Sequence, residues 1–147
     1  MPETRNADAT WSGDLLSGRG TVTASTTRVF ADLPTTWASR TGEPAGVTSP
    51  EELLAAAHAS CFSMACSNNL AKAGTPPERL TVSVAVTGDK LESGWTVISA
   101  AIRVSGVVPG ATPESFREAA EGAKDGCPIS KALKGNVALS VEATLES

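Results

Sequence analysis

The stretch from residue 49 to residue 74 is the feature that most limits how this chain can fold. It opens with Ser49-Pro50-Glu51-Glu52, where a Ser suits the N-cap, Pro suits the first helical turn and the acidic pair suits the positive end of the helix dipole. Glu52 also completes a capping-box pattern with Ser49. No charged residue follows until Lys72, and Gly74 is a typical helix stop. The pattern therefore predicts one long helix over residues 50–73.

The side chains of this helix indicate that it is buried on most sides. They are mostly small and apolar around the whole circumference, and such a helix needs partners on several faces. A chain of 147 residues is too small to wrap a helix of this length completely. We therefore expect a second copy of the chain to cover part of it, in a homodimer.

Strand patterns lie on both sides of this helix. Before it, alternation over residues 21–26 and around residues 28–33 indicates a meander or hairpin of three to four strands. The elements predicted after it are strands at 80–86, 95–104 and 137–145 and short helices at 113–124 and 128–133. This order, without a linker, predicts a single α+β domain over residues 1–147.

The charge balance narrows the classes of partner. The 12 basic and 16 acidic residues give a net charge of −4, which argues against nucleic acid and against a polybasic membrane mode. Residues 1–11 contain no apolar run typical of a signal peptide, and the least charged stretch, residues 53–71, is too polar for a membrane helix. We expect a soluble, cytoplasmic protein.

Three cysteines are the candidates for chemistry, and without an export signal they do not suggest a disulfide framework. Cys127, in Gly126-Cys127-Pro128-Ile129-Ser130, lies at a predicted helix N-cap, where backbone N–H groups and the helix dipole stabilise a thiolate. Local chemistry alone therefore makes Cys127 the candidate nucleophile, and the alternative is a cysteine that only caps the helix.

Cys61 lies in the middle of the long helix, where burial raises a thiol pKa. It is either a small core residue or a thiol activated by a cation from elsewhere in the fold. His58, three residues earlier, can be its neighbour in a Cys–His pair, or else a satisfied buried histidine. Cys66, five residues after Cys61, points to a different face and is expected to be core.

A metal site is a weaker interpretation of the same residues. His58, Cys61 and Cys127 could supply three ligands, but the chain has no Cys-x-x-Cys pair, the usual sign of zinc. We expect no metal. Gly18-Arg19-Gly20 is no phosphate loop because no helix follows it directly, and the chain has no G-x-S-x-G nucleophile elbow.

The motifs resemble those of the OsmC/Ohr family, which comprises osmotically inducible protein C and the organic hydroperoxide resistance proteins. The run SPEELLAAAHASCFSMA at 49–65 is similar to the family's central helix, and GCPIS at 126–130 to its second cysteine motif. WSGD at 11–14 and GRGT at 18–21 add to the likeness, which covers nearly the whole chain in order and spacing. The wording AHASCFSMA favours the OsmC branch over the Ohr branch.

The resemblance implies an OsmC-like fold in which two subunits intertwine, with strongly bent antiparallel sheets around long central helices and active sites at the subunit interface. It also implies a Cys-based peroxidase of the oxidative stress response, with no metal or haem cofactor. Its substrates would be organic hydroperoxides and hydrogen peroxide. By position, Cys61 would be the peroxidatic thiolate and Cys127 the resolving thiol.

The resemblance further assigns Glu51, ten positions before Cys61, as the acidic residue of the site. Two arginines match the position of the family's site arginine. Arg40 fits the OsmC-type position and is preferred, and Arg19 fits the Ohr-type position as second choice. An external dithiol, of dihydrolipoyl type in the Ohr branch, would reduce the Cys61–Cys127 disulfide.

Two other functions stay open from the sequence. The same fold could serve as a redox-sensing or binding module with little turnover. Alternatively, Cys61 and His58 could act together in acyl transfer.

Overall fold

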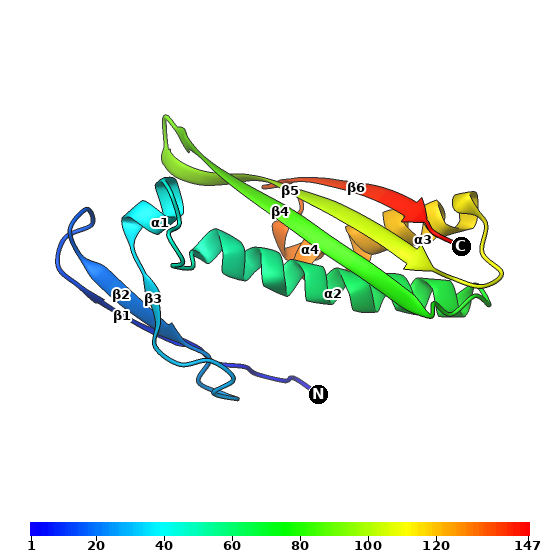
Figure 1. Ribbon diagram of the computed structural model, residues 1–147, viewed down its shortest axis with the longest axis horizontal. Coiled ribbons are helices and arrows are strands. Elements are labelled where there is room, and N and C mark those ends of the chain that lie inside the picture. Colours follow the sequence, from blue (N-terminus) through cyan, green and yellow to red (C-terminus); the bar gives the residue numbers. More distant parts are fainter. The chain divides into compact units, whose positions relative to one another are not determined.

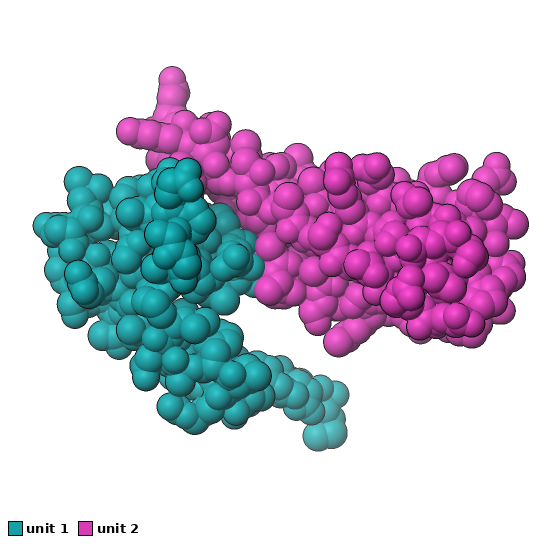
Figure 2. All heavy atoms as spheres, in the orientation of Figure 1, with its two compact units in different colours: residues 1–53 teal, residues 54–147 magenta.

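A computed structural model describes all residues 1–147 and divides the chain into two compact units, Met1–Leu53 and Leu54–Ser147 (Figures 1 and 2). Each unit has a three-stranded sheet. The single domain expected over residues 1–147 stays a prediction. No helix is both long enough and apolar enough to cross a membrane.

The first unit contains a small antiparallel sheet in the order β1-β2-β3 and a short helix. Its elements are β1 (Asp8–Ser12), β2 (Arg19–Thr23), β3 (Leu33–Thr35) and α1 (Trp37–Thr41). The expected meander is therefore present, but the strand predicted around residues 28–33 is wrong except at Leu33. Arg28 and Asp32 have φ values of 55° and 53°, outside the strand region, so residues 24–32 form a loop.

The predicted long helix is confirmed as α2 (Pro50–Lys72). The Ser49 hydroxyl accepts a hydrogen bond from the Glu52 backbone N–H at 3.1 Å, and Gly74 follows the helix with a φ of 87°. The Glu52 carboxylate has a partner other than the one the capping box predicts, because it accepts a hydrogen bond from the Thr48 hydroxyl at 2.6 Å.

Within one chain, α2 buries a single stripe rather than most of its circumference. The residues of the stripe lie four apart and are fully buried: His58, Phe62, Cys66 and Leu70. On the opposite side the Met64 side chain is 70% exposed. The expectation that a second copy covers this helix stays a prediction.

The second unit contains a sheet in the order β4-β5-β6. Its elements are β4 (Arg79–Leu91), β5 (Gly94–Val107), α3 (Pro113–Gly126), α4 (Pro128–Leu133) and β6 (Ala138–Leu145). β4 and β5 form a long antiparallel hairpin, whereas β6 pairs with β5 in parallel. The expectation of antiparallel sheets is therefore wrong for this last pair, because α3 and α4 form a crossover between β5 and β6 (Figure 1).

The core of the second unit joins α2, β5 and α3. Every second residue of β5 points inward, including Ile102 and Val104, and these pack with Phe62 and Phe116. Gly106 completes this inward row, since a Cβ there would lie 3.0 Å from the Phe116 ring. The glycine thus lets α3 approach the sheet closely, and the chain then turns at the α3–α4 junction.

Candidate functional site

Cys127 lies at the junction of two helices. Its backbone N–H donates to the Ala123 carbonyl at the end of α3, and its sulfur accepts a hydrogen bond from the Ser130 N–H at 3.4 Å as the N-cap of α4. The predicted N-cap position is therefore confirmed. The side chain is fully buried.

Cys61, on α2, is partly buried and packs against the core cluster that includes Cys127. Burial is the main cause that raises the pKa of the Cys61 thiol, the Ile129 backbone N–H opposes it, and the neighbouring Cys127 thiol raises this pKa further. The helix start at 127–130 is thus in electrostatic reach of Cys61. All three cysteines are free thiols.

Two further polar side chains adjoin Cys127. The Cys127 thiol donates to the Ser130 hydroxyl, with sulfur and oxygen 3.1 Å apart, and the same hydroxyl lies 2.8 Å from Nε2 of His58. Both His58 and Ser130 are fully buried, and Nδ1 of His58 has no hydrogen-bond partner. Desolvation lowers the pKa of His58.

Ser130 was not among the residues that the sequence singled out. The available signal was its position three residues after an N-cap cysteine, where the backbone N–H turns back to the cap. The hydrogen bond found for His58 goes to Ser130, and the pairing of His58 with Cys61 stays a prediction.

In the first unit, Arg40 and Glu51 form a close ion pair. Nε of Arg40 lies 2.9 Å from Oε2 and 3.1 Å from Oε1 of Glu51, whose side chain is only 10% exposed. The guanidinium carbon lies 5.8 Å from the centre of the Trp37 ring. Arg19, at the start of β2, is exposed. Of the two candidate arginines, Arg40 is thus the one that the structure pairs with Glu51.

A hollow of about 310 Å³ lies beside this ion pair. Its lining is mostly aromatic and aliphatic: Trp11, Leu15, Thr35, Thr36, Trp37, Arg40 and Pro50. An apolar hollow bordered by one guanidinium can hold a small organic group with a polar end. Sequence reasoning had not singled out Trp11 or Trp37 as lining residues.

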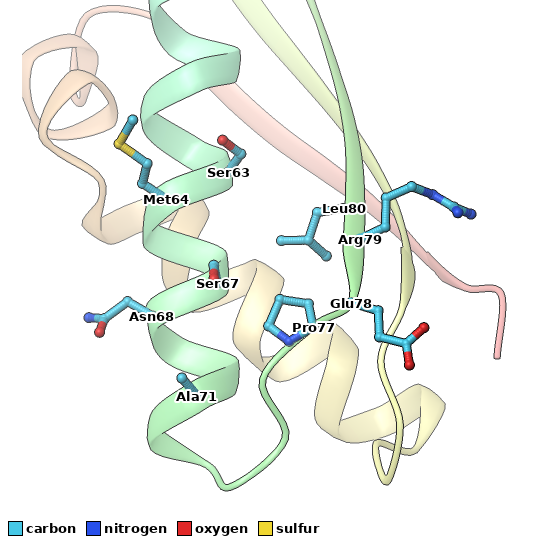
Figure 3. Close-up of a pocket in the computed structure, with 9 residues that line it drawn as sticks. All are labelled: Ser63, Met64, Ser67, Asn68, Ala71, Pro77, Glu78, Arg79 and Leu80. Atoms are coloured by element: carbon cyan, nitrogen blue, oxygen red, sulfur yellow. The ribbon is translucent and has the colours of Figure 1, made fainter.

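A larger hollow of about 620 Å³ lies along α2 and the start of β4 (Figure 3). Figure 3 shows Ser63 and Ser67 on the side of α2 turned toward Pro77 and Leu80. None of the predicted site residues lines it.

The three ligands considered for a metal do not form a binding cluster. The structure contains no group of three or more His, Cys, Asp or Glu side chains that could hold a metal ion.

Comparisons with known proteins agree on one family. A family model described as OsmC-like protein matches residues 42–142. The peroxiredoxin OsmC of Escherichia coli strain K12 is 36% identical over 138 residues, which cover 94% of this chain and 95% of that protein. The peroxiredoxin OsmC of Shigella flexneri matches with the same values.

Solved structures support the fold. The organic hydroperoxide resistance protein OhrB of Bacillus subtilis matches with a TM-score of 0.72 and 26% identity, over 95% of this chain and 98% of that one. An OsmC-like protein of Mycoplasma pneumoniae shares the fold with a TM-score of 0.71 at 16% identity, over 99% of each chain.

Proposed function

This chain belongs to the OsmC family and is a Cys-based peroxidase, and we propose that it reduces organic hydroperoxides, and hydrogen peroxide as well, through a disulfide between Cys61 and Cys127. The observation that carries this mechanism is that the two thiols are neighbours: Cys61 packs against the core cluster that includes Cys127, and the Cys127 thiol raises the pKa of Cys61. The peroxiredoxin name of the curated relatives and the hydroperoxide resistance name of OhrB support the substrate class.

In the first step, the Cys61 thiolate attacks the distal oxygen of the hydroperoxide. The O–O bond breaks, the alkoxide takes a proton and leaves as an alcohol, and Cys61 becomes a sulfenic acid. Only the thiolate is nucleophilic enough for this attack. Because burial raises the pKa of Cys61, the step requires a cation at the sulfur.

We assign this cation to Arg40. A guanidinium stays charged when partly buried, and the Glu51 carboxylate orients it because both of its oxygens accept from the Arg40 Nε–H. The apolar hollow beside Arg40 suits the organic part of a hydroperoxide. The resemblance to the family implies that the site forms at the interface of a homodimer, which is part of the proposal.

In the second step, Cys127 attacks the Cys61 sulfenic acid, which releases water and forms the disulfide. An external dithiol, of dihydrolipoyl type by analogy with the Ohr branch, restores both thiols by exchange. A cytoplasmic location belongs to this proposal, because a reducing compartment keeps such dithiols available.

The test is a thiol titration after one equivalent of cumene hydroperoxide. We expect the loss of two of the three thiols and their recovery with dithiothreitol. Cys61→Ser should consume no peroxide, whereas Cys127→Ser should stop at a sulfenic acid that dimedone traps. Cys66→Ala is the control and should behave as the unmodified protein.

The other functions give different outcomes. Thiols that are lost but not recovered with dithiothreitol indicate a redox-sensing module. Unchanged thiols together with thioester hydrolysis indicate acyl transfer by Cys61 and His58. If Cys127→Ser blocks the first turnover and Cys61→Ser does not, the roles of the two cysteines are reversed.

A further inference from the structure

The peroxidase mechanism gives no role to Ser130 and His58, two buried polar side chains that lie in one hydrogen-bonded row with Cys127. Cys127, Ser130 and His58 form a continuous hydrogen-bonded row, with 3.1 Å between the thiol sulfur and the Ser130 oxygen and 2.8 Å between that oxygen and His58 Nε2. All three are fully buried. An apolar side chain would fill the position of His58 at lower cost, since its Nδ1 has no hydrogen-bond partner there.

The direction of these hydrogen bonds determines what the row can do. The Cys127 thiol donates to the Ser130 oxygen, so the Ser130 hydroxyl proton is available for Nε2 of His58. In the tautomer of His58 with its proton on Nδ1, Nε2 accepts from the Ser130 hydroxyl, and the row then runs from the Cys127 thiol to the imidazole. A hydroxyl between a donor and an acceptor can pass a proton along by receiving one and releasing its own.

We propose that His58 is a positioning residue for the resolving step. While Cys127 attacks the oxidised Cys61, His58 takes up the thiol proton of Cys127 through the Ser130 hydroxyl. This inference rests on the proposed peroxidase function, and it adds a proton acceptor for the second thiol.

The atoms balance as follows. The Cys127 proton moves to the Ser130 oxygen and the Ser130 proton moves to His58 Nε2. The new S–S bond forms with the electron pair of the Cys127 sulfur, which is oxidised, and the S–O bond on Cys61 breaks as that sulfur is reduced. The leaving hydroxide takes a proton from solvent and becomes water. His58 then releases the proton to solvent, and when a dithiol later cleaves the disulfide, Cys127 leaves as a thiolate and takes a proton from solvent.

The burial of His58 affects where the protons of this row lie in the reduced protein. Desolvation lowers the pKa of His58, so the imidazole stays neutral in the reduced protein. Cys127 acts as a thiol donor to Ser130, and a thiol is a poorer nucleophile toward peroxide than a thiolate. The row therefore keeps the order in which the two cysteines react.

Rapid mixing with one equivalent of cumene hydroperoxide tests this inference. The reaction is quenched at intervals with N-ethylmaleimide or dimedone, and mass spectrometry measures the Cys61 sulfenic acid and the disulfide separately. The variants are Ser130→Ala, His58→Gln and Ser130→Thr, and the control is Ser60→Ala, an exposed serine on α2. Ser130→Ala removes a single oxygen, so it still tests the proton route if His58→Gln folds poorly.

We expect Ser130→Ala and His58→Gln to form the sulfenic acid within about twofold of the unmodified rate but to form the disulfide at least about tenfold more slowly, as loss of a proton acceptor requires. Ser130→Thr, which keeps the hydroxyl, should restore most of the disulfide rate. Ser60→Ala should change neither step.

Unchanged disulfide formation in both Ser130→Ala and His58→Gln overturns the inference. It is equally overturned if both steps slow by the same factor, because a purely structural role has that effect. If the unmodified protein forms no sulfenic acid on Cys61, the proposed peroxidase function has failed, and the inference fails with it.

Discussion

The three thiols of the chain differ in how far their surroundings allow them to react. Cys66 is fully buried among apolar side chains, and burial raises its pKa to about 11. Cys61 is only partly buried and has Cys127 and the Ile129 backbone N–H beside it. Cys127 adjoins Ser130 and through it His58. The local surroundings thus separate Cys66 from the two cysteines that we propose as the redox pair.

Substitution tests the proposal that Arg40 activates Cys61. Arg40→Ala should slow the oxidation of Cys61 by about 10- to 100-fold at neutral pH, because without the guanidinium less of the thiol is ionised. The rate rises with pH as the thiolate forms, and in this variant the curve should move to higher pH. Stopped-flow measurement of the rate of Cys61 oxidation from about pH 5 to about pH 10 checks this shift.

Arg19→Ala is the matched control and should leave the profile unchanged, since Arg19 is exposed and Arg40 holds the ion pair with Glu51. A shift in Arg19→Ala with none in Arg40→Ala reverses the assignment.

Cys66 should matter for stability and not for activity. Cys66→Ser places a hydroxyl in an apolar site and should lower the free energy of unfolding by about 1–3 kcal/mol, as an unsatisfied buried group does. Urea unfolding measures the change, and peroxide turnover should stay constant. A loss of turnover without a loss of stability contradicts the structural role.

Of the individual residues of the candidate site, the sequence predicted the positions of some but not the contacts between them. The spacing along α2 showed that Cys61 and Cys66 lie on different faces, and local signals placed Cys127 at an N-cap. The hydrogen bond between His58 and Ser130, however, joins residues 72 positions apart. Contacts between distant elements depend on packing, which no local pattern carries.

Among the elements, the long helix α2 and the short helix α4 were predictable, whereas the short helix α1 and the loop at 24–32 were not. The ends of α2 follow from residues next to them, the Ser49 cap and Gly74, so the predicted range is right to within a residue. The loop at 24–32 and the short helix α1 depend on tertiary contacts and turn geometry instead. The parallel pairing of β6 likewise depends on where the α3–α4 crossover returns the chain.

The cap of α2 allows a test of its start. Ser49→Ala removes the hydroxyl that accepts from the Glu52 N–H and should cost about 1 kcal/mol of stability, the usual worth of an N-cap. Chemical unfolding followed by circular dichroism measures it. Ser60→Ala, an exposed position inside the same helix, is the control and should be neutral or slightly stabilising, since alanine favours helix. Equal losses in both variants contradict a capping role.

For the whole molecule, the uncovered side of α2 is the feature to explain. Met64 is 70% exposed on a helix whose opposite stripe is fully buried. If a second copy covers this side, Met64→Glu places a charge in the interface and should shift the protein from dimer to monomer. Sedimentation equilibrium measures the shift, with Met64→Leu as the apolar control. Equal dimerisation in both variants places the interface elsewhere.

The redox state should change the stability of the fold. A bond between Cys61 and Cys127 closes a long loop, and constraining the unfolded chain in this way is worth about 4 kcal/mol. Calorimetry should show the oxidised protein melting about 10 °C above the reduced one, and Cys127→Ser should show no such difference. A lower melting temperature on oxidation indicates that the disulfide distorts the site.

The parallel strand β6 has a consequence for the synthesis of the protein. Cys127 lies in the crossover that leads from β5 to β6, and β6 is the strand that secures this crossover to the sheet. A nascent chain that has left the ribosome up to residue 130 already carries every thiol, but not the strand that fixes α3 and α4 in place. We therefore expect the two cysteines to stay apart during translation and to become neighbours only when Ala138–Leu145 has joined the sheet.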